Sequence, residues 1–196
     1  MPNQQFPAHF DPSRCVLFLG AGFSAEAKNK LNIKPPVGRE LEKEVKKLAN
    51  VADDEVSDLL DASGYALAQG FDLYGLLEGM YTIRQLAPEQ CAILSHPWRR
   101  IYTTNYDNSV SVFRTEQGQS ATDNIFDIGD DVPRKVRQGA VIHLHGSIAR
   151  CQPDNVDNSL VLSRRSYVEQ RVKKSGWWDW FDKDVRTSQY VFFLGY

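Results

Sequence analysis

The chain has 196 residues, of which 42% are hydrophobic and 24% charged, and its formal net charge is −2. These values are ordinary for a globular protein whose single domain can bury a sizeable core. A charge so near zero gives no general attraction to nucleic acid or to an anionic membrane surface. No apolar run approaches the roughly 20 residues needed to cross a bilayer. The first twelve residues lack the pattern of a secretory signal.

Three scattered cysteines, Cys15, Cys91 and Cys151, form no Cys-x-x-Cys pair. Their spacing argues against a disulfide framework and against a structural zinc site. We therefore expect a cytoplasmic protein without zinc.

Apolar, β-prone runs that stop abruptly at small or polar residues are interpreted as strands. The four main runs are Cys15–Leu19, Arg99–Thr104, Ala140–Leu144 and Gln189–Leu194, and shorter strands are expected near Asn124–Ile128 and at Leu160–Leu162. Stretches of helical composition separate the main runs, which is typical of crossover connections between parallel strands. The sequence therefore predicts an α/β fold, a Rossmann-like and mostly parallel sheet with helices on both faces.

The remaining segments are interpreted as a polar lead-in, several helices and loops. Residues 1–13 form the lead-in, and residues 14–196 form one domain with a small helical module at about 50–94. Helices are expected at Ser24–Lys30, at Arg39–Ala49, as two to four short helices without a strand over Asp53–Leu94, from about Arg164, and around Trp177–Val185, with a loop at Cys151–Asn158. Trp177, Trp178 and Trp180 are read as packing residues, because aromatic side chains at helical spacing belong more often to a core than to a stacking platform.

The chain stops one residue after Gly195, at a strand end where a ligand loop should begin. We therefore expect an N-terminal fragment or the first domain of a longer protein.

Gly20-Ala21-Gly22-Phe23-Ser24 follows the first strand. The first glycine permits a tight turn and the second permits close approach of a pyrophosphate, which a following helix N-terminus would favour. The third glycine of the Rossmann fingerprint is absent, with Ala25 in its place, and no acidic residue follows at the expected distance. The alternative is a tight turn without a ligand.

Polar side chains also follow two further strands. Asn105 and Asp107 come after the second main run, where they offer an amide and a carboxylate, or else form an Asx turn or helix cap. His143 and His145 alternate along the third run. We expect a buried, hydrogen-bonded His143, and we take His145, next to Gly146, as the candidate general base. No third ligand accompanies the pair, so a metal site is not predicted.

In this order the motifs resemble the sirtuin family, specifically the sirtuin-like NAD hydrolase domain of prokaryotic antiphage defence systems. The glycine segment resembles the family's Gly-Ala-Gly-x-Ser loop, Thr104-Asn105-Tyr106-Asp107 its Thr-Asn-Tyr-Asp form, and His145-Gly146 its catalytic His-Gly. Leu160–Ser163 with Tyr167 resembles a segment of the defence branch, and Phe193–Tyr196 its ribose-binding strand. The zinc ribbon and the peptide-clamping segment of the deacylases are missing, and the helical module stands in the place of the ribbon.

The resemblance implies an NAD hydrolase that releases nicotinamide and ADP-ribose as the toxic effector of an abortive-infection system. NAD is then the substrate, bound by Gly20, Ala21, Gly22, Phe23, Ser24, Thr104, Gly146 and Gly195. Asn105 would orient water and ribose, His145 would act as general base, and Asp107 would orient the ribose or carboxamide. Homo-oligomerisation on activation and a sensor domain or partner, which recognises a phage component or nucleic acid, are implied as well. An NAD-dependent protein deacylase and a non-catalytic module that senses NAD or ADP-ribose are the alternatives.

Overall fold

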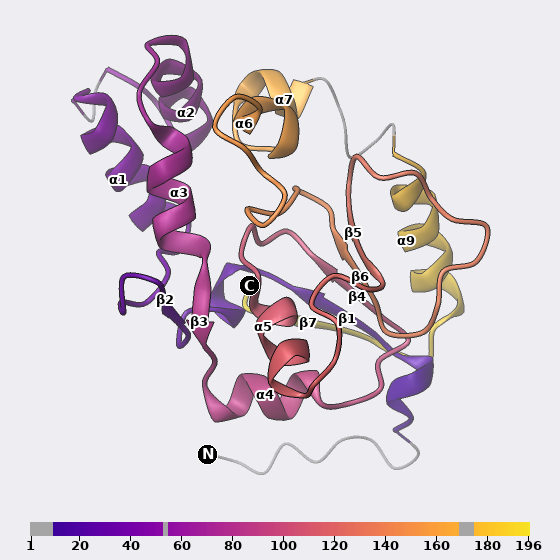
Figure 1. The fold of residues 1–196 in the computed structure, drawn as a ribbon. Coiled ribbons are helices and arrows are strands. Elements are labelled where there is room, and N and C mark those ends of the chain that lie inside the picture. Colours follow the sequence, from indigo (N-terminus) through magenta and orange to yellow (C-terminus); the bar gives the residue numbers. More distant parts are fainter. Residues whose placement is uncertain (1–9, 53–54, 169–174) are drawn as a thin grey trace.

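The computed structural model describes residues 10–52, 55–168 and 175–196 (Figure 1). Its centre is a five-stranded sheet of order β5-β6-β4-β1-β7, in which every neighbouring pair runs parallel. The strands are β1 (Val16–Leu19), β4 (Arg100–Thr103), β5 (Ile125–Asp127), β6 (Ala140–His143) and β7 (Val191–Leu194). The predicted α/β class is confirmed, and so are the four main runs and the shorter run near Ile125.

Alternate residues of the strands enter two different apolar layers, as the two-residue period of a strand requires. The covering helices are α4 (Pro88–Leu94), α5 (Ser109–Glu116) and α9 (Gly176–Thr187). Leu17 and Val141 pack with α4 and α5 on one face. Phe18 and Ile142 pack with α9 on the other face, where Trp177 is fully buried. Helices on both faces are therefore confirmed (Figure 1).

A helical module lies beside the sheet and has its own apolar cluster. It consists of α1 (Gly38–Ala49), α2 (Leu59–Ala68) and α3 (Leu73–Tyr81), and it faces α6 (Val156–Ser159) and α7 (Arg164–Val168) (Figure 1). Leu41 and Val45 of α1 join Leu160 and Leu162 in this cluster. The predicted boundaries of about 50–94 need correction, because α1 belongs to the module whereas α4 packs on the sheet.

The helix predicted at Ser24–Lys30 is wrong. A three-residue 3₁₀ helix, η2 (Ala21–Phe23), lies within the glycine segment, and β2 (Lys28–Asn29) then pairs antiparallel with β3 (Ile83–Gln85). The buried side chain of Asn29 explains this: its Nδ2 donates to the carbonyl of Met80, and its Oδ1 accepts from two nearby backbone N–H groups. Such contacts offer the backbone an alternative to a helix. Because β3 lies between residues 53 and 94, the expectation of no strand in that segment is also wrong.

Two smaller predictions around residue 160 need correction. Leu160–Leu162 is not a strand, because its backbone groups form hydrogen bonds with side chains. The Tyr106 hydroxyl donates to the carbonyl of Val161, and the N–H of Leu162 donates to Ser166 Oγ. The loop expected before it contains α6.

At the start of the chain, residues 10–13 of the expected lead-in are described and run into η1 (Pro12–Arg14), whereas residues 1–9 lie outside the described residues. Residues 53–54 of the predicted helical stretch, and residues 169–174 of the helix expected from Arg164, lie outside them too. In the described part of the chain, no helix has the length and apolar character that a membrane crossing demands.

Candidate functional site

The predicted motifs meet at one edge of the sheet. Leu19, Thr103 and His143 are aligned across β1, β4 and β6, and Leu194 is aligned with Leu19 from the other side. Backbone bonds continue this alignment past the strand ends, for example from the N–H of Gly20 to the carbonyl of Leu194 at 2.8 Å. In an open parallel sheet this carboxyl edge is where ligands bind.

The glycine loop packs directly against the end of β7. The N–H of Gly22 donates to the carbonyl of Gly195 at 2.9 Å. A Cβ atom on Gly20 would lie 2.7 Å from the same carbonyl oxygen, and Gly195 has a φ of +82° with a hypothetical Cβ only 2.2 Å from the nitrogen of Phe23. Glycine is thus required at these positions by the close approach of two backbones. The helix N-terminus expected to attract phosphate is not present, because η2 has three residues and the first α-helix begins at Gly38.

Asn105 connects the end of β4 to this loop. Its side chain is 8% exposed, and its Nδ2 donates to the carbonyl of Gly20 at 2.9 Å. Its backbone N–H donates to Thr103 Oγ1 at 2.9 Å, which fixes the turn that follows the strand. Thr104, the next predicted residue, lies within hydrogen-bond distance of the Tyr196 hydroxyl. The side chain of Asn105 is therefore bonded to the glycine loop, and Thr104 contacts Tyr196, two residues past the end of β7.

Asp107 is a connecting residue in this structure. Its Oδ2 accepts from Ser24 Oγ at 2.7 Å and its Oδ1 accepts from the N–H of Ser109 at 2.9 Å, at the start of α5. Both oxygens of the buried carboxylate are thus used within the protein. Of the alternatives considered for this segment, the geometry directly supports the Asx turn, because Oδ1 accepts from the N–H two residues on, whereas the N-cap of α5 is Asn108 and its side chain makes no capping bond.

The two histidines differ in their surroundings. His143 is buried, and its Nδ1 lies 3.1 Å from the carbonyl oxygen of Asn105, so the prediction of a buried, hydrogen-bonded ring is confirmed. His145 is partly buried, and the loss of hydration lowers the pKa of its ring from 6.5 to about 4. Its imidazole is therefore neutral near pH 7, but it is a weaker base than an imidazole in water, because burial disfavours the charged form.

Gly146 allows the chain to turn directly after His145. Its φ is +81°, and a Cβ atom there would lie 1.9 Å from the carbonyl oxygen of Ser159. The N–H of Val161 donates to the carbonyl of His145 at 3.0 Å, so the turn is held against the segment that leads from α6 to α7.

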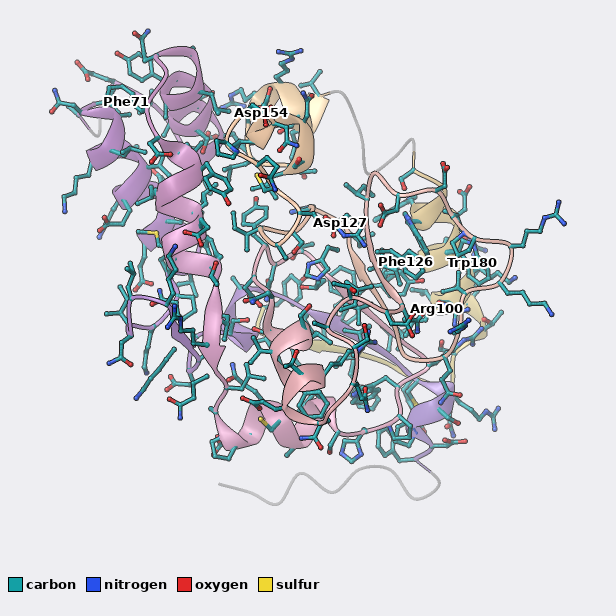
Figure 2. The ribbon with its side chains drawn as sticks, viewed as in Figure 1. Phe71, Arg100, Phe126, Asp127, Asp154 and Trp180 are labelled. Atoms are coloured by element: carbon teal, nitrogen blue, oxygen red, sulfur yellow. The ribbon has the colours of Figure 1, made fainter. Side chains whose placement is uncertain are left out.

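Sequence reasoning missed one acidic residue at this edge. Asp127, labelled in Figure 2, ends β5. It is aligned with His143 of β6 and is 8% exposed. Burial raises the pKa of its carboxyl group, and the nearby His143 and Arg150 partly offset this rise. Its Oδ2 accepts from the N–H of Ser147 at 3.2 Å. The signal was present, because Ile125–Asp127 is another apolar strand that ends in a polar residue.

The profile of the SIR2-like domain matches residues 99–196, which is half of the chain. The chain belongs to the SIR2-like domain family. The matched half runs from β4 to the end of β7 and contains Asn105, Asp107, His145 and Gly195, whereas the glycine loop lies before it. Members of the SIR2-like family are NAD-dependent enzymes. No curated protein matches the chain.

Two cavities of the SIR2-like chain lie away from these residues. One, of about 910 Å³, adjoins β5 and the loop after it and includes Asn124, Asp130 and Arg150. The other, of about 480 Å³, lies beside α4 and α5 and includes Leu94 and Phe113. Neither is lined by Asn105, Asp107 or His145, so the candidate site is defined by its hydrogen bonds and by the sheet edge.

The structure bears on the metal and stacking roles that the histidines and tryptophans invited. Among the described residues, no group of three or more His, Cys, Asp or Glu side chains is arranged to hold a metal ion. Trp177 packs on Phe126 with ring centroids 4.7 Å apart, and the guanidinium of Arg100 lies 4.8 Å from the ring centroid of Trp180 (labelled in Figure 2). For these two tryptophans the packing interpretation is confirmed, whereas Trp178 remains 40% exposed.

Proposed function

We propose that this SIR2-like domain hydrolyses NAD at the bond between nicotinamide and ribose. The proposal is supported by family membership and by one observation above all. The side chain of Asn105, from the end of β4, is bonded to the glycine loop at the end of β1, and His143 reaches the backbone of the same asparagine. This bonding links two of the resembling motifs directly at the carboxyl edge of the sheet, and His143 stands two residues before the third, His145-Gly146.

In this reaction the protein itself contributes little covalent chemistry. Water forms a bond to C1′ of the ribose, and the glycosidic electron pair leaves with nicotinamide, which becomes neutral. One proton from the water is released, and the other product is ADP-ribose. In this proposal Asn105 orients the water and the ribose, and the neutral ring of His145 accepts the proton. Asp107 acts by holding Ser24 and the start of α5 in place.

The test is NAD turnover by the purified protein, with nicotinamide and ADP-ribose separated by chromatography. Asn105→Ala and His145→Ala should each lower kcat by about a hundredfold or more, as expected for losing a positioning group or a general base. His96→Ala is the control, because it removes an imidazole that packs against Phe10 and Trp98, away from the carboxyl edge. Full activity of both site variants would contradict the assignment.

Two other outcomes would replace the proposal. With an acyl-peptide present, acyl-ADP-ribose formed in step with nicotinamide would indicate a deacylase. Calorimetric binding of NAD without turnover would indicate a module that only senses the nucleotide.

We further propose that the activity serves antiphage defence and is held in check by assembly or by a partner, because unregulated loss of NAD would stop growth of the host. The resemblance to the defence branch supports this role. Cells that express the wild type should lose NAD and stop growing after phage infection, whereas cells that express Asn105→Ala should keep both. Equal NAD content in the two strains through infection would contradict the role.

A further inference from the structure

Tyr106 follows Asn105 directly in the segment after β4. Its side chain is partly buried and packs against the apolar cluster of the helical module. Burial raises the pKa of its hydroxyl group above the ordinary value of 10, so the group is a protonated donor at neutral pH. A buried hydroxyl of this kind needs an acceptor, and the acceptor shows what the side chain holds in place.

The hydroxyl of Tyr106 reaches the segment between α6 and α7. It donates to the carbonyl of Val161 at 2.8 Å, across 55 positions of the chain. The N–H of Val161 in turn donates to the carbonyl of His145 at 3.0 Å. One residue, Val161, therefore connects the side chain of Tyr106 to the backbone of the candidate general base.

The backbone of Tyr106 is bonded to the same turn at a second point. Its carbonyl accepts from the N–H of Ile148 at 2.8 Å, three residues after His145. Asn105, the preceding residue, is bonded through its side chain to the carbonyl of Gly20. Tyr106 thus joins the segment that carries Asn105 to the turn that carries His145.

Apolar packing does not fix this geometry by itself. Leu160 and Leu162 are buried in the cluster of the module, but apolar burial has no preferred direction. A hydrogen bond has a preferred length and angle. The bond from Tyr106 therefore determines how the backbone of Val161 is turned toward His145.

We propose that Tyr106 is a positioning residue of the candidate site: its hydroxyl, through the backbone of Val161, sets the placement of His145 relative to Asn105. Such placement matters because a shift of about 1 Å in a reacting group can lower a rate by about a hundredfold. The catalytic consequence rests on the proposed NAD hydrolysis, whereas the bonded link does not.

Tyr106→Phe tests the link, because it removes the hydroxyl and keeps the ring. Tyr81→Phe is the matched control. The Tyr81 ring packs edge-on against that of Tyr106, with centroids 5.8 Å apart, and its hydroxyl donates to the carbonyl of Pro36 at 3.0 Å, in the loop before α1. Each variant therefore loses one hydroxyl that is bonded to a backbone carbonyl, but only Tyr106→Phe loses the bond to Val161.

Two readouts are expected to change in Tyr106→Phe and not in the control. Amide hydrogen exchange of Val161, measured by NMR relative to the amides of β1, should be about tenfold faster than in the wild type, as for loss of a buried hydrogen bond. The kcat for NAD should fall about tenfold or more, with KM little changed, because the reacting groups are displaced while the binding contacts remain. In Tyr81→Phe both the exchange ratio and kcat should stay within about twofold of the wild type.

The outcomes separate this inference from the proposed function. If the exchange ratio of Val161 is the same in Tyr106→Phe as in Tyr81→Phe, the link is overturned. Faster exchange with an unchanged kcat overturns the positioning role, whatever happens to KM. A wild type that does not hydrolyse NAD overturns the proposed function, and the exchange ratio alone then decides the link.

Urea unfolding of the two variants separates positioning from a general loss of stability. Because each loses one buried hydroxyl contact, both should lose a similar part of the free energy of unfolding. A lower kcat in Tyr106→Phe alone, at equal stability, supports positioning. An equal fall of kcat in Tyr81→Phe would overturn it, because the hydroxyl of Tyr81 has no bond to the turn.

Discussion

Protonation of His145 should destabilise the native state as the pH falls. The pKa of this ring is about 4 in the folded protein and near 6.5 in an unfolded chain, and burial is the cause. Between these values the unfolded chain binds more protons than the native state. Stability therefore rises with pH across this window and is lost as the pH falls below about 6.5.

The size of the effect follows from the two pKa values. Linkage gives a loss of about 2 kcal/mol between pH 7 and pH 5 from this one ring, and about 3 kcal/mol once the pH is below 4. With a urea dependence of roughly 2 kcal/mol per molar, the loss at pH 5 moves the unfolding midpoint by about 1 M.

Urea unfolding of the wild type and of His145→Gln at pH 7 and pH 5 measures the stability lost through protonation of His145, because the variant keeps all other titrating groups. The wild type should lose about 2 kcal/mol more than the variant over this interval. His96→Gln is the matched control. If His145→Gln loses as much stability as His96→Gln does between the two pH values, the burial argument for His145 is refuted.

Two further predictions concern stability and use urea unfolding at pH 7. Asp184→Asn should lower the free energy of unfolding by about 3 kcal/mol, because the fully buried carboxylate accepts a hydrogen bond from Tyr102 and pairs with two arginines. Asp182→Asn, at an exposed ion pair on the same helix, should lower it by less than about 1 kcal/mol. Similar losses for both would contradict the buried network. Both Gly146 and Gly118 have a positive φ, but only at Gly146 does a backbone oxygen occupy the space of the new Cβ. Gly146→Ala should therefore lower the free energy of unfolding by well over the roughly 1–2 kcal/mol expected for Gly118→Ala. Equal costs would mean that the chain near residue 146 relaxes freely.

The parallel sheet could be predicted because its strands are continuous apolar runs, such as Val16–Leu19, that are buried on both faces. Continuous runs of this kind are a local signal. The short pair β2–β3 carried no such signal. It depends on Asn29, whose amide reaches Met80, 51 positions along the chain. A contact at that separation is invisible to periodicity.

Part of the candidate site could likewise be predicted from local sequence signals. Asn105 and His145 stand directly after apolar runs, so their placement at the sheet edge follows once the strands are parallel. Asp127 also ends an apolar run, but its position next to His143 depends on the alignment of β5 with β6, which cannot be inferred from the sequence. Shifting that alignment by one residue would turn the carboxylate to the other face.

The hydrogen bonds within the glycine loop indicate which half of NAD would contribute more to its binding affinity. The loop's N–H groups at Gly20, Gly22 and Phe23 are bonded to acceptors of the protein, and the 3₁₀ turn within the loop has only three residues and hence little dipole. A pyrophosphate lying over this loop would therefore have to displace the carbonyl of Gly195 to gain the N–H of Gly22. The buried polar end of the site, by contrast, already has Asn105 fixed in place. Recognition in this SIR2-like domain should accordingly depend more on the nicotinamide riboside half of the dinucleotide than on its phosphates, because only groups fixed before binding avoid the cost of being ordered by the ligand.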